Sequence, residues 1–171
     1  MSETPRIRWQ ALSWFAVVRT YQECTRRYTI LLSHFDLTVT QFDVLNAIMR
    51  LEERATPHAI AEVLVVTRGN ITGVLQRLRE NDWIVTRRHH ADGRSFVCAL
   101  TETGLIRLER ARRAAALFID QQLEPFSDEE LKDTRQLMDR MREHLLTIDP
   151  DEIATRIGEA DLESLSAGAQ S

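Results

Sequence analysis

Side chains suited to nucleic-acid contact gather in one short segment of the chain, TRGNITGVLQRLREND, residues 67–82. Arg68, Asn70 and Thr72 stand near its start, where a helix N-terminus offers free N–H groups and partial positive charge that suit a phosphate. Arginine can pair with guanine, asparagine with adenine, and threonine can bond a phosphate or pack on a thymine methyl group. An ordinary solvated surface is the alternative. The residue types therefore favour DNA contact if the fold presents them outward.

The same segment has the pattern of a helix that is buried on its other side. Thr67 is the predicted N-cap. Gly69 and Gly73 each cost about 1 kcal/mol against alanine in a helix, but without side chains they let another backbone approach closely, here DNA. Arg77 lies further along, where a phosphate contact and a purely solvated role both fit. The inward stripe consists of Ile71, Val74, Leu75 and Leu78.

A second group of charged residues follows in DWIVTRRHHADGRSFVCALT. Arg87 and Arg88 are predicted phosphate contacts, with plain surface charge as the alternative. Asp92 and Arg94 flank a glycine in a stretch that is typical of a turn between two strands. These residues would extend the predicted contact surface beyond the helix.

Charge is distributed unevenly along the chain, which has a net charge of −4. Residues 54–98 contain seven arginines and four acidic residues, so 7 − 4 = +3. Residues 123–171 contain five basic and thirteen acidic residues, so 5 − 13 = −8. Local charge matters more than the total for a polyanionic partner. The basic middle of the chain is therefore the predicted DNA-binding part, although chance clustering on solvated faces is the alternative.

The sequence offers no set of residues that could catalyse a reaction. It contains no paired nucleophile and base, no phosphate loop and no cluster of metal ligands. Its two cysteines, Cys24 and Cys98, form neither a disulfide framework nor a CxxC pair. The chain is therefore predicted to be a non-enzyme without a cofactor or metal.

Length and hydropathy set further bounds. At 171 residues, 43% of them hydrophobic, the chain fits one domain with an extension. It lacks the run of about 18 apolar residues that a membrane span needs. Its first residues, MSETPRIRWQ, lack the apolar core of a signal peptide. We expect a cytoplasmic protein that does not contact a membrane.

Apolar periodicity predicts the elements that position these residues. A long first helix is expected over 9–32, and a second helix capped by Thr40. Thr56 and Pro57 mark the start of a short third helix. The helix of residues 67–82 follows, and then a hairpin with strands over 83–87 and 96–101, the latter with Phe96, Cys98 and Leu100 on one face.

Two helices are expected after the hairpin, one from Thr101 to about Leu123 and one capped by Ser127 with Glu130. Asp149 and Pro150 can start one more short helix. Short helices followed by a hairpin form a winged helix-turn-helix, in which the second helix of the turn motif enters the major groove. The predicted fold class is mostly α with a small β-hairpin wing.

Five short motifs, in order and at the right spacing, resemble the MarR family of bacterial transcription regulators. The motifs are LTVTQFDVL, TPHAIAEVL, TRGNITGVLQRLREND with the following WI, DGR and ALTETG. The resemblance covers 36–146 closely and the first helix by pattern only. It implies that Arg94 enters the minor groove while Asp92 holds its guanidinium in place.

Two residues depart from the family pattern. Asp82 stands where a glycine usually ends the recognition helix, and Asn81-Asp82 can take the left-handed conformation at some cost. Val65 replaces a usual glycine in the helix-turn-helix turn, where a β-branched residue tolerates positive φ badly.

The resemblance also implies a homodimer that binds a pseudo-palindromic operator in double-stranded DNA. It divides the chain into an N-terminal helix over 1–35, a DNA-binding domain over 36–101, dimerisation helices over 102–148, and a short helix with an acidic tail over 149–171. Intramolecular packing of the same helices is the alternative. The predicted dimerisation residues are Trp9, Leu12, Phe15, Leu131, Met138, Met141 and Leu145.

Members of this family commonly bind small aromatic or anionic molecules between the first helix and the DNA-binding lobe. The candidate effector-pocket residues are Trp14, Tyr21, Tyr28 and Phe42, for each of which core packing is the alternative. One branch of the family senses peroxide with a cysteine in the first helix, at about the place of Trp14. Cys24 lies in that helix but further along it, so an apolar-face role is favoured.

The sequence thus predicts a dimeric, sequence-specific transcription regulator, a repressor released by a small effector. The alternatives are a winged-helix adaptor that binds only proteins, and a redox-responsive regulator that uses Cys24. Arg68, Asn70 and Arg94 argue against the adaptor, because a purely protein-binding module has no need of them.

Overall fold

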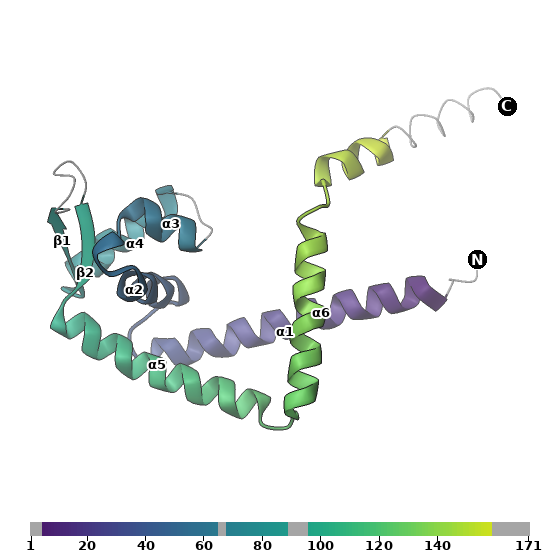
Figure 1. The fold of residues 1–171 in the computed structure, drawn as a ribbon, viewed down its shortest axis with the longest axis horizontal. Helices are drawn as coiled ribbons and strands as arrows, with labels where there is room; N and C mark the ends of the chain where they lie inside the picture. Colours follow the sequence, from purple (N-terminus) through teal and green to yellow (C-terminus); the bar gives the residue numbers. More distant parts are fainter. Residues whose placement is uncertain (1–4, 65–67, 89–95, 159–171) are drawn as a thin grey trace. The chain divides into compact units, whose positions relative to one another are not determined.

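The computed structural model describes residues 5–64, 68–88 and 96–158 of the chain. The described residues are mostly helical and contain one two-stranded antiparallel sheet, which confirms the predicted fold class (Figure 1). The chain forms two compact units, Met1–Gln122 and Leu123–Ser171. The first unit contains the lobe made of α2, α3, α4 and the hairpin, from which the long helices α1 and α5 extend.

Helix α1 (Pro5–Ser33) is followed by α2 (Val39–Leu51), which begins with a capping box. The Thr38 hydroxyl accepts a hydrogen bond from the Gln41 N–H at 3.2 Å, and Gln41 Oε1 accepts one from the Thr38 N–H at 2.9 Å. The prediction that Thr40 caps this helix is wrong by two residues. Only the earlier threonine has a glutamine three residues on, and the box satisfies two backbone donors instead of one.

A 3-10 turn, η1 (Glu52–Arg54), leads to α3 (Pro57–Leu64). The Thr56 hydroxyl accepts a hydrogen bond from the Ala59 N–H at 3.1 Å, which confirms the predicted cap. Helix α4 (Arg68–Glu80) comes next. The predicted Thr67 cap and the turn at Val65 lie outside the described residues.

Helix α4 ends in a Schellman motif centred on Asp82, whose φ is 57°. The Trp83 N–H donates to the Leu78 carbonyl and the Asp82 N–H to the Arg79 carbonyl, both at 2.9 Å. This is the pair of bonds that usually surrounds a C-terminal glycine. Of the pair Asn81-Asp82, to which the sequence allows the left-handed conformation, Asp82 is the residue that adopts it.

Strands β1 (Ile84–Arg88) and β2 (Phe96–Leu100) pair antiparallel, with Ile84 opposite Leu100. On β2, Phe96 is 51% exposed, while Val97 and Cys98 are both buried. Strand β2 is contacted by α2, α3 and η1, and its Cys98 N–H donates to the Ala55 carbonyl at 2.8 Å. A strand covered from several sides buries residues of both parities.

Helix α5 (Glu102–Leu123) starts where it touches the end of α4. The Thr101 hydroxyl accepts a hydrogen bond from the Gly104 N–H at 2.9 Å and donates one to the Asp82 carbonyl at 2.6 Å. The Thr101 N–H donates a hydrogen bond to the Trp83 carbonyl at 3.0 Å. A side chain on Gly104 would place its Cβ only 1.9 Å from the Trp83 carbonyl oxygen. The start of α5 is therefore in direct backbone contact with the base of the hairpin.

The second unit contains α6 (Asp128–Leu145) and a further helical stretch over 150–158. Ser127 and Glu130 form the predicted capping box. The Asp149 carboxylate accepts a hydrogen bond from the Asp151 N–H at 2.9 Å, which confirms the predicted start of the short helix.

Three described residues other than glycine have positive φ, and all three are acidic. They are Asp36 (56°), Glu52 (51°) and Asp82 (57°), whereas no described glycine has positive φ. Each lies just past the end of a helix, since α1 ends at Ser33, α2 at Leu51 and α4 at Glu80.

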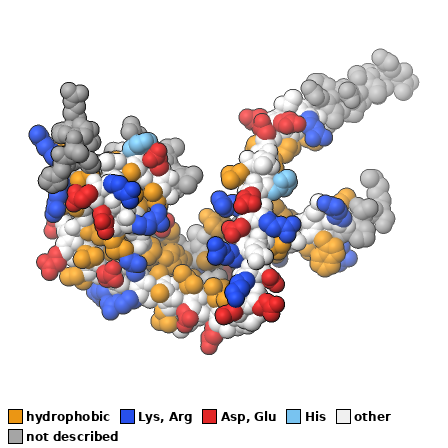
Figure 2. Space-filling view, in the orientation of Figure 1, with side chains coloured by type: hydrophobic (Ala, Val, Ile, Leu, Met, Phe, Trp, Pro, Cys, Tyr) orange, Lys and Arg blue, Asp and Glu red, His pale blue; other side chains and the backbone are white. Residues whose placement is uncertain are grey.

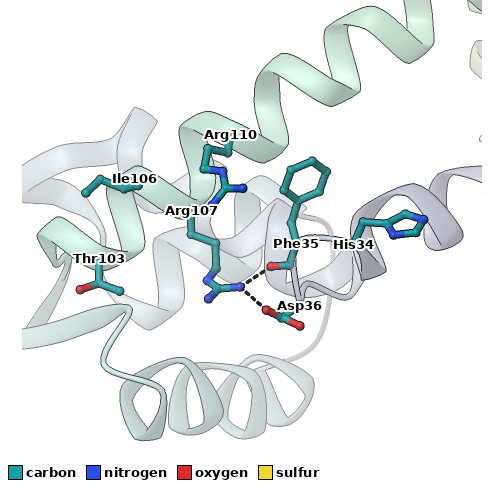
Figure 3. A pocket seen from close by; sticks show the side chains of 7 residues that line it. All are labelled: His34, Phe35, Asp36, Thr103, Ile106, Arg107 and Arg110. Atoms are coloured by element: carbon teal, nitrogen blue, oxygen red, sulfur yellow. Dashed lines mark hydrogen bonds and ion pairs between the residues drawn. The ribbon is translucent and has the colours of Figure 1, made fainter.

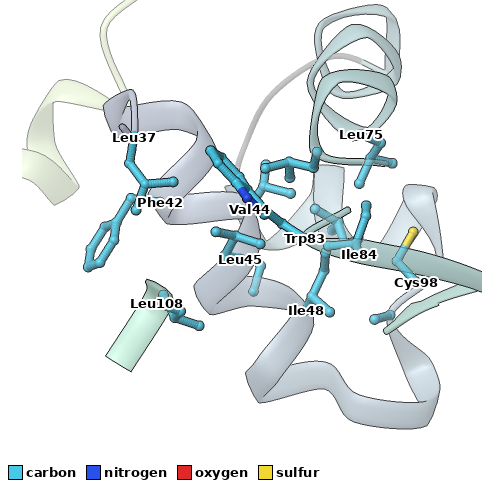
Figure 4. Packing of buried hydrophobic residues seen from close by; sticks show 14 of the residues in the cluster. Leu37, Phe42, Val44, Leu45, Ile48, Leu75, Trp83, Ile84, Cys98 and Leu108 are labelled. Carbon is cyan, nitrogen blue, oxygen red and sulfur yellow. The ribbon is translucent and has the colours of Figure 1, made fainter. Parts of the chain in front are cut away.

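One hydrophobic core lies beneath α2 and joins it to α4, the hairpin and α5 (Figure 4). From its predicted inward stripe, α4 contributes Ile71, Leu75 and Leu78, with Val74 partly buried beside them. Ten of the packed side chains are labelled: Leu37, Phe42, Val44, Leu45, Ile48, Leu75, Trp83, Ile84, Cys98 and Leu108.

Candidate nucleic-acid interface

The outer face of α4 carries polar residues that the sequence predicts to contact DNA. Asn70, Thr72 and Arg77 are exposed, while Ile71 and Leu78 on the opposite face are buried. The 3.6-residue period of a helix separates the two sets, because steps of three and four return to the same side. Arg68 is the first residue of α4, and its side chain lies outside the described part, as does Thr67.

The two glycines of α4 leave open space beside the helix backbone. A Cβ built on Gly69 or on Gly73 would have no other heavy atom within 4 Å. Packing inside the described chain therefore gives no reason for a glycine at either position. Because glycine has no side chain, the helix backbone at these two positions can approach an external surface more closely than it could with any other residue there.

The end of α4 is fixed by side chains as well as by the Schellman motif. Asn81 Nδ2 donates to the Arg77 carbonyl at 2.8 Å, and Trp83 inserts into the core directly after the turn. These contacts set the direction in which β1 leaves the helix, and therefore where the hairpin lies relative to the exposed face of α4.

Strand β1 ends in two exposed arginines, Arg87 and Arg88. Successive residues of a strand point to opposite faces, so the pair offers positive charge on both sides of the hairpin. Figure 2 shows basic side chains at the edge of the lobe where β1 runs. Asp92 and Arg94, the predicted wing-tip residues, lie outside the described residues.

Arg107 is a charged residue of this region that sequence reasoning missed. From α5 it reaches the turn between α1 and α2, where its Nη1 donates to the Phe35 carbonyl and, at 2.8 Å, to Asp36 Oδ2 (Figure 3). The guanidinium carbon lies 4.5 Å from the centre of the Trp83 ring. A sequence signal existed, since an arginine stands beside the buried positions Gly104, Leu108, Ala111 and Ala115 of α5.

Around Arg107 there is a pocket of about 310 Å³ between α5 and the α1–α2 turn. Thr103, Ile106 and Arg110 line it from α5, and His34 and Phe35 from the other side (Figure 3). The pocket combines two guanidinium groups with an apolar wall, which would suit an anion with a hydrophobic part.

Comparison with known proteins decides the family. The family model of the MarR family matches residues 35–95. A helix-turn-helix type transcriptional regulator of Bacillus cereus is 32% identical over 135 residues, which cover 78% of this chain and 89% of that protein. The chain belongs to the MarR family. It is therefore a winged-helix, DNA-binding transcriptional regulator and not an enzyme.

Solved structures of other regulators have the same fold as this MarR-family chain. The complex of Staphylococcus aureus MepR with DNA has a TM-score of 0.69 at 19% identity, covering 77% of this chain and 94% of MepR. The organohalide-sensing regulator RdhR in its 2,4-dichlorophenol-bound form has a TM-score of 0.69 at 17% identity, covering 84% and 86% of the two chains. Among the described helices of this MarR-family regulator, none has the length and apolar character that a membrane crossing requires.

The four predicted effector-pocket residues of the MarR-family chain occupy different environments. Phe42 is 6% exposed and belongs to the core, where its ring centre lies 6.1 Å from that of the half-buried Tyr28. Tyr21 is 70% exposed, and Trp14 is also exposed. Trp14 and Tyr28 lie about 21 Å apart along the helix axis, so a single chain does not bring all four side chains into one cavity.

A crevice of about 550 Å³ lies between α1 and α5 of this MarR-family regulator, near the half-buried Cys24. Cys24 Sγ is 3.8 Å from Gln122 Oε1, and Phe118 lines the same crevice. Cys98 is buried in the core, and burial raises the pKa of its thiol. A higher pKa reduces the thiolate fraction, so the structure supports an inert Cys98.

Most of the predicted dimerisation residues of the MarR-family chain are exposed within the unit to which each belongs. Trp9, Leu12 and Phe15 of α1 are exposed, and Figure 2 shows apolar side chains on the N-terminal part of this helix. In the second unit, Met138, Met141 and Leu145 are exposed and Leu131 is half-buried.

Proposed function

We propose that this MarR-family regulator binds a pseudo-palindromic operator as a homodimer and represses transcription until a small effector releases it. The observation that carries the proposal is the outer face of α4, where Asn70 and Arg77 are exposed beside two glycines that meet no other atom. Asparagine can read adenine in a major groove, and Arg77, further along the helix, is proposed to hold a phosphate.

Exposed arginines on the neighbouring strand support the same reading. Arg87 and Arg88 follow the base of the hairpin and are proposed to hold phosphates, while Arg68 and Thr67 are proposed contacts at the start of the helix. Thr72 is exposed on α4 and is proposed to meet a phosphate or a thymine methyl group. Phosphate contacts position a protein on the duplex, and base contacts specify the sequence.

Dimerisation is supported by apolar side chains that are exposed within each of the two units. Trp9 is 67% exposed and Leu145 is also 67% exposed, which is costly for large apolar groups when many lie together. We propose that a second copy of the chain covers them, since the two halves of a pseudo-palindrome require two recognition helices.

For the effector we propose the crevice between α1 and α5. Phe118 offers an aromatic face, and Arg19 and Arg27 offer positive charge, although Arg27 is already hydrogen-bonded to Glu23. The related fold of RdhR carries 2,4-dichlorophenol in one solved structure. A small aromatic or anionic molecule is therefore the proposed class, and the arginine-lined pocket beside Arg107 is the second candidate position.

The experiment that tests the proposal measures fluorescence anisotropy of a duplex from the region upstream of the protein's own gene. Arg94→Ala is expected to weaken binding by about 1–3 kcal/mol, because a direct groove contact is lost. Equal binding by the variant and the wild type would rule out the wing contact. Adding 2,4-dichlorophenol or benzoate to the complex then tests release.

Light scattering on the same samples provides the control for the Arg94 variant. Both proteins should have a mass of twice 19.8 kDa, because the substitution lies outside the proposed dimer surface. A wild type that is monomeric at micromolar concentration would contradict the homodimer. Absence of binding to any upstream duplex would instead favour the protein-binding adaptor.

A further inference from the structure

Arg107 joins three parts of the chain that are far apart in sequence. It belongs to α5, its Nη1 bonds the Phe35 carbonyl and the Asp36 carboxylate at the end of α1, and its guanidinium lies over the Trp83 ring. Trp83 is the residue whose N–H closes the Schellman motif of α4. One side chain therefore connects both long helices to the end of the helix that is proposed to read DNA.

The backbone around Arg107 tightens this connection. Thr101 bonds the Asp82 and Trp83 carbonyls, and Gly104 lies so close to Trp83 that no side chain fits between them. The first two turns of α5 cannot shift without moving the end of α4 or breaking these contacts. Closely packed interfaces of this kind move between discrete arrangements and do not deform gradually.

Stability alone gives a poor account of an arginine at this position. Its Nε is buried and has no hydrogen-bond partner among the described groups, which is unfavourable for a polar atom. The ion pair to Asp36 adds little, because the Asp36 side chain is 79% exposed to solvent. An apolar side chain over Trp83 would avoid the buried, unbonded donor.

We propose that Arg107 is a positioning residue for DNA binding. By bonding the α1–α2 turn while it stacks on Trp83, it fixes the angle at which α4 and the hairpin leave the long helices. In a dimer the long helices set the distance between the two recognition helices, so this angle decides whether both reach their half-sites together. The proposal rests on operator binding as proposed above.

The test compares Arg107→Met with Arg110→Met in anisotropy titrations on the upstream duplex and on a scrambled duplex of equal length. Methionine keeps an unbranched apolar stem against Trp83 and removes the bonds to Phe35 and Asp36. Arg110 lies one turn on and lines the same pocket but does not make those two bonds, so it is a matched control for lost charge. Thermal unfolding is recorded for each protein.

We expect Arg107→Met to lose about tenfold in affinity for the upstream duplex, a size typical of substitutions in coupled contacts. Its affinity for the scrambled duplex should stay within about twofold of wild type, because phosphate contacts need no fixed half-site spacing. If the role of Arg107 were purely structural, Arg107→Met would lower the melting temperature of the protein and weaken its binding to both duplexes by a similar factor. Arg110→Met should retain the preference for the upstream duplex.

Several outcomes would overturn the proposal. The first is that Arg107→Met binds the upstream duplex as tightly as wild type does. The second is that Arg107→Met loses affinity for both duplexes by the same factor. The third is that Arg110→Met loses as much affinity for the upstream duplex as Arg107→Met does. If Arg107→Met does not fold, Asp36→Gly replaces it, because glycine keeps the positive φ and removes the carboxylate that accepts a hydrogen bond from Arg107 Nη1. An unchanged preference for the upstream duplex in that variant also overturns the proposal. A wild type that binds neither duplex preferentially contradicts operator binding itself.

Discussion

Replacing Gly104 with alanine is expected to lower the free energy of unfolding by about 3 kcal/mol, at the upper end of the cost of overpacking. The added Cβ would lie 1.9 Å from the Trp83 carbonyl oxygen and 2.8 Å from its carbonyl carbon. Both neighbours are backbone atoms, so no side chain can rotate away. The start of α5 must separate from the end of α4. Urea unfolding followed by circular dichroism measures the change.

Gly73→Ala is the matched control, because it makes the same substitution inside another helix. Its Cβ meets no heavy atom within 4 Å, so alanine is expected to raise stability by about 0.5–1 kcal/mol through its better helix propensity. Equal destabilisation by the two variants would mean that the close contact at Gly104 is not what matters. A stabilised Gly73→Ala that binds the operator more weakly would support close approach of DNA to α4.

Operator affinity is expected to fall about a thousandfold when salt rises from about 50 to 200 mM. Arg77, Arg87 and Arg88 are proposed phosphate contacts, and a dimer would make six, which gives a slope of log affinity against log salt of about −5. Each neutralised phosphate releases condensed counterions, and added salt opposes that release. Anisotropy titrations at four salt concentrations measure the slope.

Two substitutions test which arginines produce the slope of log affinity against log salt. Arg87→Gln should make it shallower by about 2, since a dimer loses two phosphate contacts. Arg135→Gln should leave it unchanged, because Arg135 lies in α6 of the acidic C-terminal unit beside Asp139. A slope near zero for the wild type would contradict DNA binding through phosphate contacts and would favour the protein-binding adaptor.

Much of the fold could be predicted because local signals agree with the final structure. Thr56 and Ser127 cap helices as their neighbours indicate, and α4 ends at the Asn81-Asp82 pair, where the family pattern has a glycine. Such features depend on residues a few positions apart. The inward face of α4 was equally predictable, because Ile71 and Leu78 recur with the helical period.

Features set by distant segments were harder to predict. Val97 is buried together with Cys98 because α2, α3 and η1 contact β2, which alternation along one strand cannot reveal. The role of Arg107 depends on Asp36 and Trp83, 71 and 24 positions earlier (107 − 36 and 107 − 83). The Thr38 cap of α2, by contrast, has a local signal, because Gln41 lies three residues after it and completes the capping box.

The three acidic residues with positive φ, Asp36, Glu52 and Asp82, have an evolutionary consequence. Each holds a conformation that costs most side chains about 1–2 kcal/mol and costs glycine almost nothing. A glycine at Glu52 or Asp82 would add stability, and it would touch none of the proposed base contacts, whereas Asp36 also accepts a hydrogen bond from Arg107. A lineage carrying this fold can therefore accept a destabilising change on the outer face of α4, acquire a new operator preference, and restore stability later at a helix end.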